Sequence, residues 1–236
     1  MSWNNPAWSG YVQFDASGFK SVEAEWIVPS IPSTPTDPNA IVFIWIGIGG
    51  GQAFYGQPNT PGVIQIGTGA NYISGSPNYF AWWETFGMPG DLGFENNTLA
   101  QDKYPVKPGD QIHAAVYANP DTWNLLLLNT TQGWHFTSTP FYTLNTQTAE
   151  FIVEAPVKKD SSGNFTPVPL PNYGKLTFDN CTVNGVNPHF DFEKESGFMF
   201  DINNPSKIIS IPSAPDSDTD GFTVAFGSTA PPPPSS

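Results

Sequence analysis

Proline and glycine are so frequent in this chain that long helices have little room. Of the 236 residues, 25 are Pro and 22 are Gly. Proline removes a backbone N–H and clashes within a helix, and glycine costs conformational entropy there. Because both are spread along the chain, few windows could hold a helix of about ten residues. We therefore expect short strands joined by turns.

Several segments support this by alternating apolar and polar residues with a period of two, as a half-buried strand does. The clearest is residues 22–28, and residues 111–117 and 175–178 are similar. The leucine run in residues 123–129 instead predicts a strand that is buried on both faces. Many short strands with frequent turn signals predict an all-β protein, an antiparallel sandwich or barrel.

The length fits one domain, which we place over residues 1–227. A domain of this size buries a sufficient core without disulfides, and Cys181 has no partner for one. Two loops rich in turn residues are expected at 29–39 and 155–172. Residues 228–236 are rich in Pro and Ser, which predicts a disordered tail.

The charge balance excludes several classes of partner. Acidic residues number 21 against eight lysines, so the net charge is −13 at neutral pH, which argues against nucleic acid and anionic membranes. No apolar run is long enough to span a membrane. The N-terminal residues lack the pattern of a signal peptide, so Met1 would begin either a trimmed secreted domain, which we favour, or a cytoplasmic protein. We expect a monomer.

Two polar side chains stand out because they lie among Val and Ile in expected strands. Gln65 shares a strand face with Gly67, whose missing side chain leaves room beside the amide. Glu154 shares a face with Glu150, but about 13 Å separates them along the strand, so they form no close pair. Burial near tryptophans would raise the pKa of Glu154, which suits acid–base chemistry. The alternatives are a solvated Glu at a strand end and a Gln that bonds across strands.

These segments also carry a resemblance to a family. Residues 149–156, Ala-Glu-Phe-Ile-Val-Glu-Ala-Pro, resemble the glutamate segment of the glutamic peptidases, or eqolisins. Further segments are similar in the family's order: residues 8–11, 22–29, 45–49, 81–84 and 108–110. A likeness that runs over so many segments is far more specific than one short motif.

The resemblance implies a β-sandwich of two large curved antiparallel sheets and an acid-active endopeptidase that cuts polypeptides without metal or cofactor. It implies that Gln65 and Glu154 are the catalytic pair, in a groove between the sheets. Glu154 would take a proton from water and return it to the leaving amine, and Gln65 would stabilise the oxyanion, without a covalent intermediate. Trp45, Trp82 and Glu84 would form the walls of the groove and bind substrate.

Some positions depart from the family pattern. Many members carry Asp where Gly49 stands, and some carry acidic or hydroxylated residues in place of Phe80 and Phe86. The polar network around the pair is therefore expected to be thinner. The disulfide of the fungal members is absent, which favours a bacterial-type member.

Two other acidic segments allow alternative interpretations. Asp191, Glu193 and Glu195 would lie on one strand face about 7 Å apart, a spacing open to a carbohydrate-active sandwich, either glycosidase or lectin. The segment 216–221 resembles the start of a calcium loop, but the twelfth position is Gly227, so we expect a solvated turn.

Overall fold

The computed structural model describes residues 1–57, 62–87, 97–159 and 165–235, and nearly all of their regular structure is strand. The strands are β1 (Trp3–Asn5), β2 (Trp8–Phe14), β3 (Ser21–Ile27), β4 (Val42–Ile48), β5 (Val63–Ile73), β6 (Ser76–Phe86), β7 (Gln111–Ala118), β8 (Trp123–Asn129), β9 (Trp134–Ser138), β10 (Thr148–Glu154), β11 (Val157–Lys159), β12 (Phe165–Pro167), β13 (Lys175–Val183), β14 (Ser196–Asp201), β15 (Asn204–Pro212) and β16 (Phe222–Phe226). A 3-10 turn, η1, covers Gln52–Tyr55, and the helix α1 covers Phe192–Glu195. Among the described residues no helix is long and apolar enough to cross a membrane.

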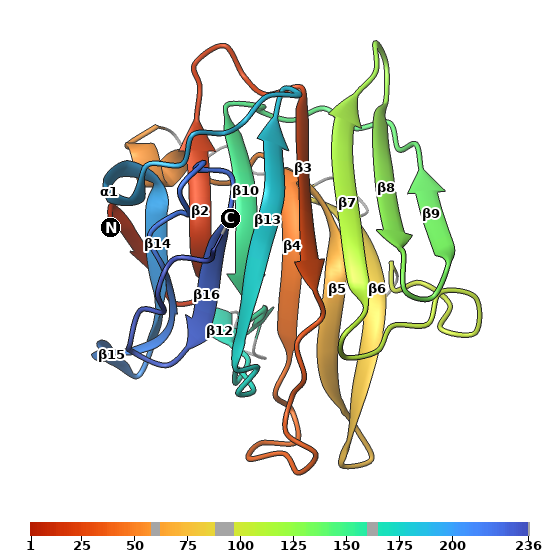
Figure 1. Cartoon of the computed structure of the whole chain (residues 1–236), viewed down its shortest axis with the longest axis vertical. Helices are drawn as coiled ribbons and strands as arrows, with labels where there is room; N and C mark the ends of the chain where they lie inside the picture. The colour runs from red at the N-terminus through yellow and green to blue at the C-terminus, as the bar shows by residue number, and fades with distance from the viewer. Residues whose placement is uncertain (58–61, 88–96, 160–164, 236) are drawn as a thin grey trace.

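One continuous sheet forms both layers of the fold. Its strand order is β6-β5-β4-β10-β2-β14-β15-β16-β13-β3-β7-β8-β9, and β1 adds to β14 as a parallel partner. The sheet folds over, so that β4 and β5 pack against β3, β7 and β8 (Figure 1). Every other pairing is antiparallel among the described strands. The predicted antiparallel sandwich is confirmed.

The strands β4, β5 and β10 are apolar on both faces because each face is covered. The main core fills the space between the layers and includes Ile64 and Ile66 of β5. On the opposite face a second cluster gathers around Phe43, Trp45 and Trp82. Alternate residues of one strand thus supply two separate apolar clusters, as the strand geometry requires.

Two sequence predictions need correction. In β8 the buried residues alternate with half-buried ones, so the leucine run is covered on one face, not both. The reason is that β8 lies in the layer of β7–β9, and Figure 1 shows no further layer over its outward face. The predicted loop at 155–172 contains the hairpin of β11 and β12. The predicted loop at 29–39 is confirmed.

Candidate active site

The pairing of β5 with β6 places Gln65 directly opposite Glu84. Gln65 Nε2 donates to Glu84 Oε2 at 2.8 Å, and the two residues are only 5% and 7% exposed. Gln65 Oε1 is also buried, yet it finds no hydrogen-bond partner among the described residues. A buried carbonyl oxygen without a partner costs about 1–3 kcal/mol, so this atom is suited to accept a bond from a ligand or water.

Glu154 ends β10 and is half-buried. Trp45 Nε1 donates to Glu154 Oε2 at 2.7 Å, and Trp8 packs edge-on against Trp45 with ring centroids 5.1 Å apart. Burial raises the pKa of Glu154 to about 7, although the indole groups of Trp8 and Trp45 oppose the shift. The carboxyl group therefore exchanges its proton near neutral pH, as a general acid–base catalyst does.

A glycine makes this arrangement possible. Gly67 pairs with Trp45 on one side and with Trp82 on the other. A Cβ atom at Gly67 would lie 2.0 Å from the carbonyl oxygen of Ile44 and 2.8 Å from Trp45 Cβ, both far inside van der Waals contact. The absent side chain thus allows Trp45 to pack closely against β5 between Gln65 and Glu154.

A single cavity of about 420 Å³ brings the polar groups together. Its lining residues are Asn5, Pro6, Ala7, Trp8, Phe43, Val63, Gln65, Trp82, Glu84, Phe86, Glu154, Pro156 and Val157. The volume and the mixture of an apolar wall with few polar groups are typical of ligand sites.

The cavity lies on the outer face of the layer that contains β4 and β5. The prediction that Gln65 and Glu154 lie in a groove between the two sheets is therefore wrong. Ile64 and Ile66 point into the space between the layers, whereas Val63 belongs to the cluster on the other face. Gln65, two residues from Val63, shares its face because strand side chains alternate. The space between the layers is filled by core side chains.

The three expected wall residues have different places. Trp82 and Glu84 line the cavity, and Trp82 Nε1 donates to the carbonyl oxygen of Thr68 at 3.2 Å. Trp45 is fully buried and is not a lining residue; it contacts Glu154 from behind. Trp8 also lines the cavity, which was not predicted, although Trp8 begins one of the family-like segments.

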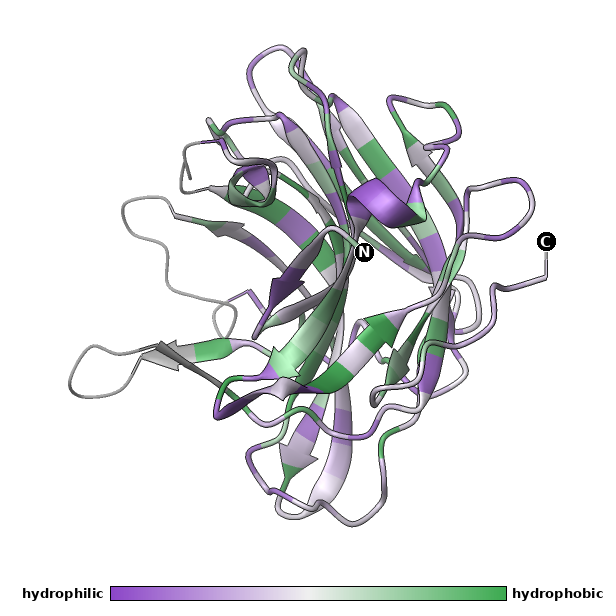
Figure 2. Cartoon of the chain, turned by 90° about the vertical axis from the view of Figure 1, so that its left-hand side faces the viewer, coloured by the Kyte–Doolittle hydropathy of each residue, from purple (hydrophilic) through white to green (hydrophobic). Residues whose placement is uncertain are grey.

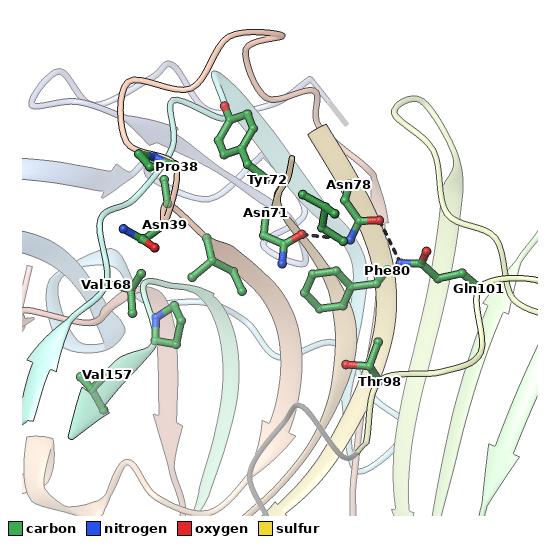
Figure 3. A pocket seen from close by; sticks show the side chains of 14 residues that line it. Pro38, Asn39, Asn71, Tyr72, Asn78, Phe80, Thr98, Gln101, Val157 and Val168 are labelled. Atoms are coloured by element: carbon green, nitrogen blue, oxygen red, sulfur yellow. Dashed lines mark hydrogen bonds between the residues drawn. The ribbon is translucent and has the colours of Figure 1, made fainter. Parts of the chain in front are cut away.

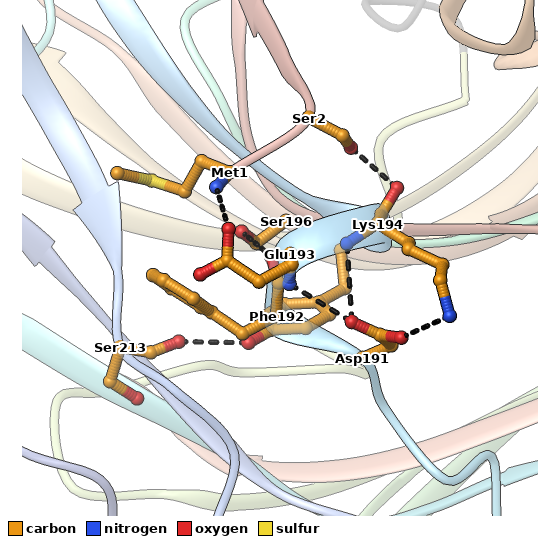
Figure 4. A network of polar contacts seen from close by, with 9 residues as sticks. Met1, Ser2, Asp191, Phe192, Glu193, Lys194, Ser196 and Ser213 are labelled. Carbon is orange, nitrogen blue, oxygen red and sulfur yellow. Dashed lines mark hydrogen bonds and ion pairs between the residues drawn. The ribbon is translucent and has the colours of Figure 1, made fainter.

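The acidic segment 191–195 was predicted to be a strand, but it forms the N-cap and the single turn of α1. Asp191 is the N-cap of α1, and its Oδ1 accepts from the backbone N–H groups of Glu193 and Lys194. Its other oxygen accepts from Lys194 Nζ at 2.7 Å, and Glu193 contacts the N-terminal amine (Figure 4). Figure 2 shows this hydrophilic helix beside the N-terminus. Asp is a favoured N-cap residue, so local capping outweighed the alternating pattern.

A second acidic group lies away from the cavity. Asp179, Asp216 and Asp220 place one oxygen each within 4.8 Å of one another, and they form the only such cluster of possible metal ligands in the described residues. None of them lines the cavity with Glu154. Asp216 Oδ1 accepts from the Asp220 N–H at 3.2 Å, but Asp216 is only 6% exposed, so its carboxyl group is not solvated as the sequence predicted.

Comparison with known proteins defines the class. The model of the peptidase A4 family matches residues 6–225, nearly the whole chain. The chain therefore belongs to the peptidase A4 family and is a glutamic peptidase, an enzyme that hydrolyses peptide bonds. A search of the curated proteins finds no match.

Solved structures support the fold. A crystal structure of scytalido-glutamic peptidase with a transition state analog inhibitor shares 20% identity at a TM-score of 0.71, and covers 94% of this chain and 98% of that one. SCP-B, an eqolisin in complex with the tripeptide Ala-Ile-His, shares 21% sequence identity at a TM-score of 0.68. The match again covers 94% of this chain and 98% of that one. Aspergilloglutamic peptidase from Aspergillus niger shares 21% sequence identity at a TM-score of 0.54, over 79% of this chain and 99% of that one. At these identities the likeness concerns the fold alone.

Proposed function

We propose that this peptidase cleaves internal peptide bonds with Gln65 and Glu154 acting on one water molecule. The observation that carries the proposal is that a partnerless buried oxygen of Gln65 and a proton-exchanging carboxyl group of Glu154 line the same cavity. An acceptor and a base are the two groups needed to hold a water and remove its proton.

In the proposed reaction, the Glu154 carboxylate takes a proton from the water as its oxygen attacks the scissile carbonyl carbon. Gln65 Oε1 accepts from that water, and the Nε2 hydrogen not used by Glu84 donates to the oxyanion. The protonated Glu154 then gives its proton to the leaving nitrogen, and the C–N bond breaks. One residue is base and then acid, and no bond forms between enzyme and substrate.

The pKa of Glu154 sets the pH range of this reaction. Since the base must be ionised before attack, a pKa of about 7 makes the active fraction fall tenfold for each pH unit below that value. The rate should therefore rise through weakly acidic solution and level off above about pH 7, at higher pH than the acid activity that the resemblance implies. We further propose a secreted monomer, which its acidic, lysine-poor composition suits.

The substrates we propose are polypeptides, in line with the tripeptide and the transition state analogs bound to related enzymes. The test is hydrolysis of casein and of a quenched fluorescent peptide near pH 6 by the Gln65→Ala and Glu154→Gln variants. Each should lower kcat by about 10²–10³-fold, the usual effect of losing an acid–base or oxyanion group. Glu193→Gln, on the exposed face of α1, is the matched control. Wild-type rates in either active-site variant would exclude that residue from the mechanism.

A further inference from the structure

A second cavity of about 420 Å³ adjoins the active-site cavity. The two share Pro156 and Val157 as lining residues. Phe43 of the active-site cavity and Phe80 of the second one also contact edge to face, with centroids 5.7 Å apart. The two cavities are therefore neighbours, and the contact between Phe43 and Phe80 lies between them.

Side-chain amides are the distinguishing feature of this second cavity, which we call the carboxamide pocket. Four of its lining residues carry amides: Asn39, Asn71, Asn78 and Gln101 (Figure 3). Among the described residues that line it, none is acidic or basic, although the chain as a whole has a net charge of −13. Amides stay neutral at every pH and can both donate and accept hydrogen bonds, so the pocket suits an uncharged polar ligand.

Three of the amides form a chain of hydrogen bonds in which each amide donates to the next. Gln101 Nε2 donates to Asn78 Oδ1 at 3.1 Å, and Asn78 Nδ2 donates to Asn71 Oδ1 at 2.9 Å. No described residue accepts a bond from Asn71 Nδ2, which Figure 3 shows on the cavity side of the chain. The chain thus fixes the orientation of Asn71 and leaves its N–H donors available to a ligand carbonyl.

The strand register places this donor relative to Glu154. Glu154 pairs with Phe43, Phe43 pairs with Gly69, and Asn71 follows Gly69 by two residues on the same strand face. Two residues along a strand span about 7 Å, which is also the length of two residues of extended peptide. The two strand spacings from β10 to β5 add about 10 Å across the sheet, so Glu154 and Asn71 are about 12 Å apart. A polypeptide whose scissile bond lies at Glu154 therefore reaches Asn71 in about three to four extended residues.

We propose that the carboxamide pocket binds the main chain of the polypeptide substrate, about three to four residues from the cleaved bond. A peptide supplies the carbonyl that Asn71 lacks and is as uncharged along its main chain as the pocket. Sugars usually stack on an exposed aromatic face, and Phe80 of this pocket is only 3% exposed. The proposal rests on the proposed function, because it places the ligand relative to Glu154.

The test compares a short and a long quenched peptide with the same central sequence. The short one has two residues on each side of the cleaved bond, and the long one adds four neutral Ala and Ser residues to each end. Wild type should show a higher kcat/KM for the long peptide, by about tenfold. Asn71→Leu and Asn78→Leu, which keep the side-chain size, should each reduce this preference by about three- to tenfold and leave the short peptide unaffected. Asn124→Leu, at a half-buried position in β8, is the control that should change neither rate.

Outcomes that overturn the inference differ from those that overturn the proposed function. Suppose that wild type cleaves both peptides. If it then shows no preference for the long peptide, or if both variants keep that preference, the carboxamide pocket is not a substrate site. If wild type cleaves neither, the proposed function fails. Fluorescence anisotropy of the labelled long peptide with the Glu154→Gln protein then tests the pocket without turnover: weaker binding after Asn71→Leu supports it, and unchanged binding overturns it. Binding of maltohexaose in place of the peptide would overturn it too.

Discussion

A buried carboxyl group should make this protein more stable in acid than at neutral pH. Glu150 of β10 is fully buried, and neither of its oxygens has a hydrogen-bond partner among the described residues. Burial raises its pKa well above 4.5. The Thr148 hydroxyl and the Gly51 N–H oppose the shift, but they bond each other at 3.2 Å and neither bonds Glu150 with good geometry.

The sign of the effect follows from proton linkage. A carboxyl group whose pKa is raised by folding binds its proton more tightly in the native state, so its contribution is complete below pH 4.5 and is lost as the pH rises toward the folded-state pKa. The loss is about 1.4 kcal/mol per pH unit between the unfolded-state and the folded-state pKa. For a chain of this length, 1 kcal/mol corresponds to about 2–4 °C in Tm.

The assay is the Tm of wild type, Glu150→Gln and Glu193→Gln from pH 4.5 to 6.5. The Gln variant cannot ionise, so relative to it the Tm of wild type should fall by about 3–6 °C per pH unit until the pH passes the folded-state pKa. The buried amide adds a constant cost, which shifts the whole curve without changing its slope. Glu193 is exposed, and its variant should parallel wild type. Parallel curves for wild type and Glu150→Gln would refute the reasoning.

Three further changes test the site. Glu84→Ala removes the acceptor that holds Gln65 Nε2, so kcat should fall about tenfold at nearly constant KM, and Glu84→Gln, which retains an acceptor, should recover most of it in steady-state assays. Trp45→Phe removes a donor that lowers the pKa of Glu154, so the midpoint of the pH–rate profile should move upward. Gly67→Ala places a Cβ 2.0 Å from a backbone oxygen, and chemical denaturation should show a loss of at least about 1–3 kcal/mol.

The sequence predicts the fold because its signals are local. In β3 the buried residues alternate as the pattern at 22–28 requires, since one face of this strand meets the core. Proline and glycine exclude long helices wherever they fall. Where local signals conflict, prediction fails: Asp191 can alternate along a strand or cap a helix, and only the bonds to Glu193 and Lys194 decide between them.

The candidate site is less accessible to prediction, because it depends on strand register. Gln65 and Glu154 were identifiable as polar groups in apolar strands. That Glu84 lies opposite Gln65 follows from the register of the β5–β6 hairpin. That Trp45 bonds Glu154 from behind follows from the pairing of β4 with β10, two segments far apart in the chain. The side of the sheet that bears the cavity depends on which face the other layer covers, which alternation within one strand does not reveal.

The most direct test of the account is the pH dependence of kcat/KM for a peptide substrate, measured for wild type and Glu154→Gln. We predict that the wild-type value rises about tenfold per pH unit to a midpoint near the Glu154 pKa of about 7, and that the variant's residual activity lacks this rise. A wild-type plateau that extends down to about pH 3, or the same rise in the variant, would contradict the claim that ionised Glu154 activates the water.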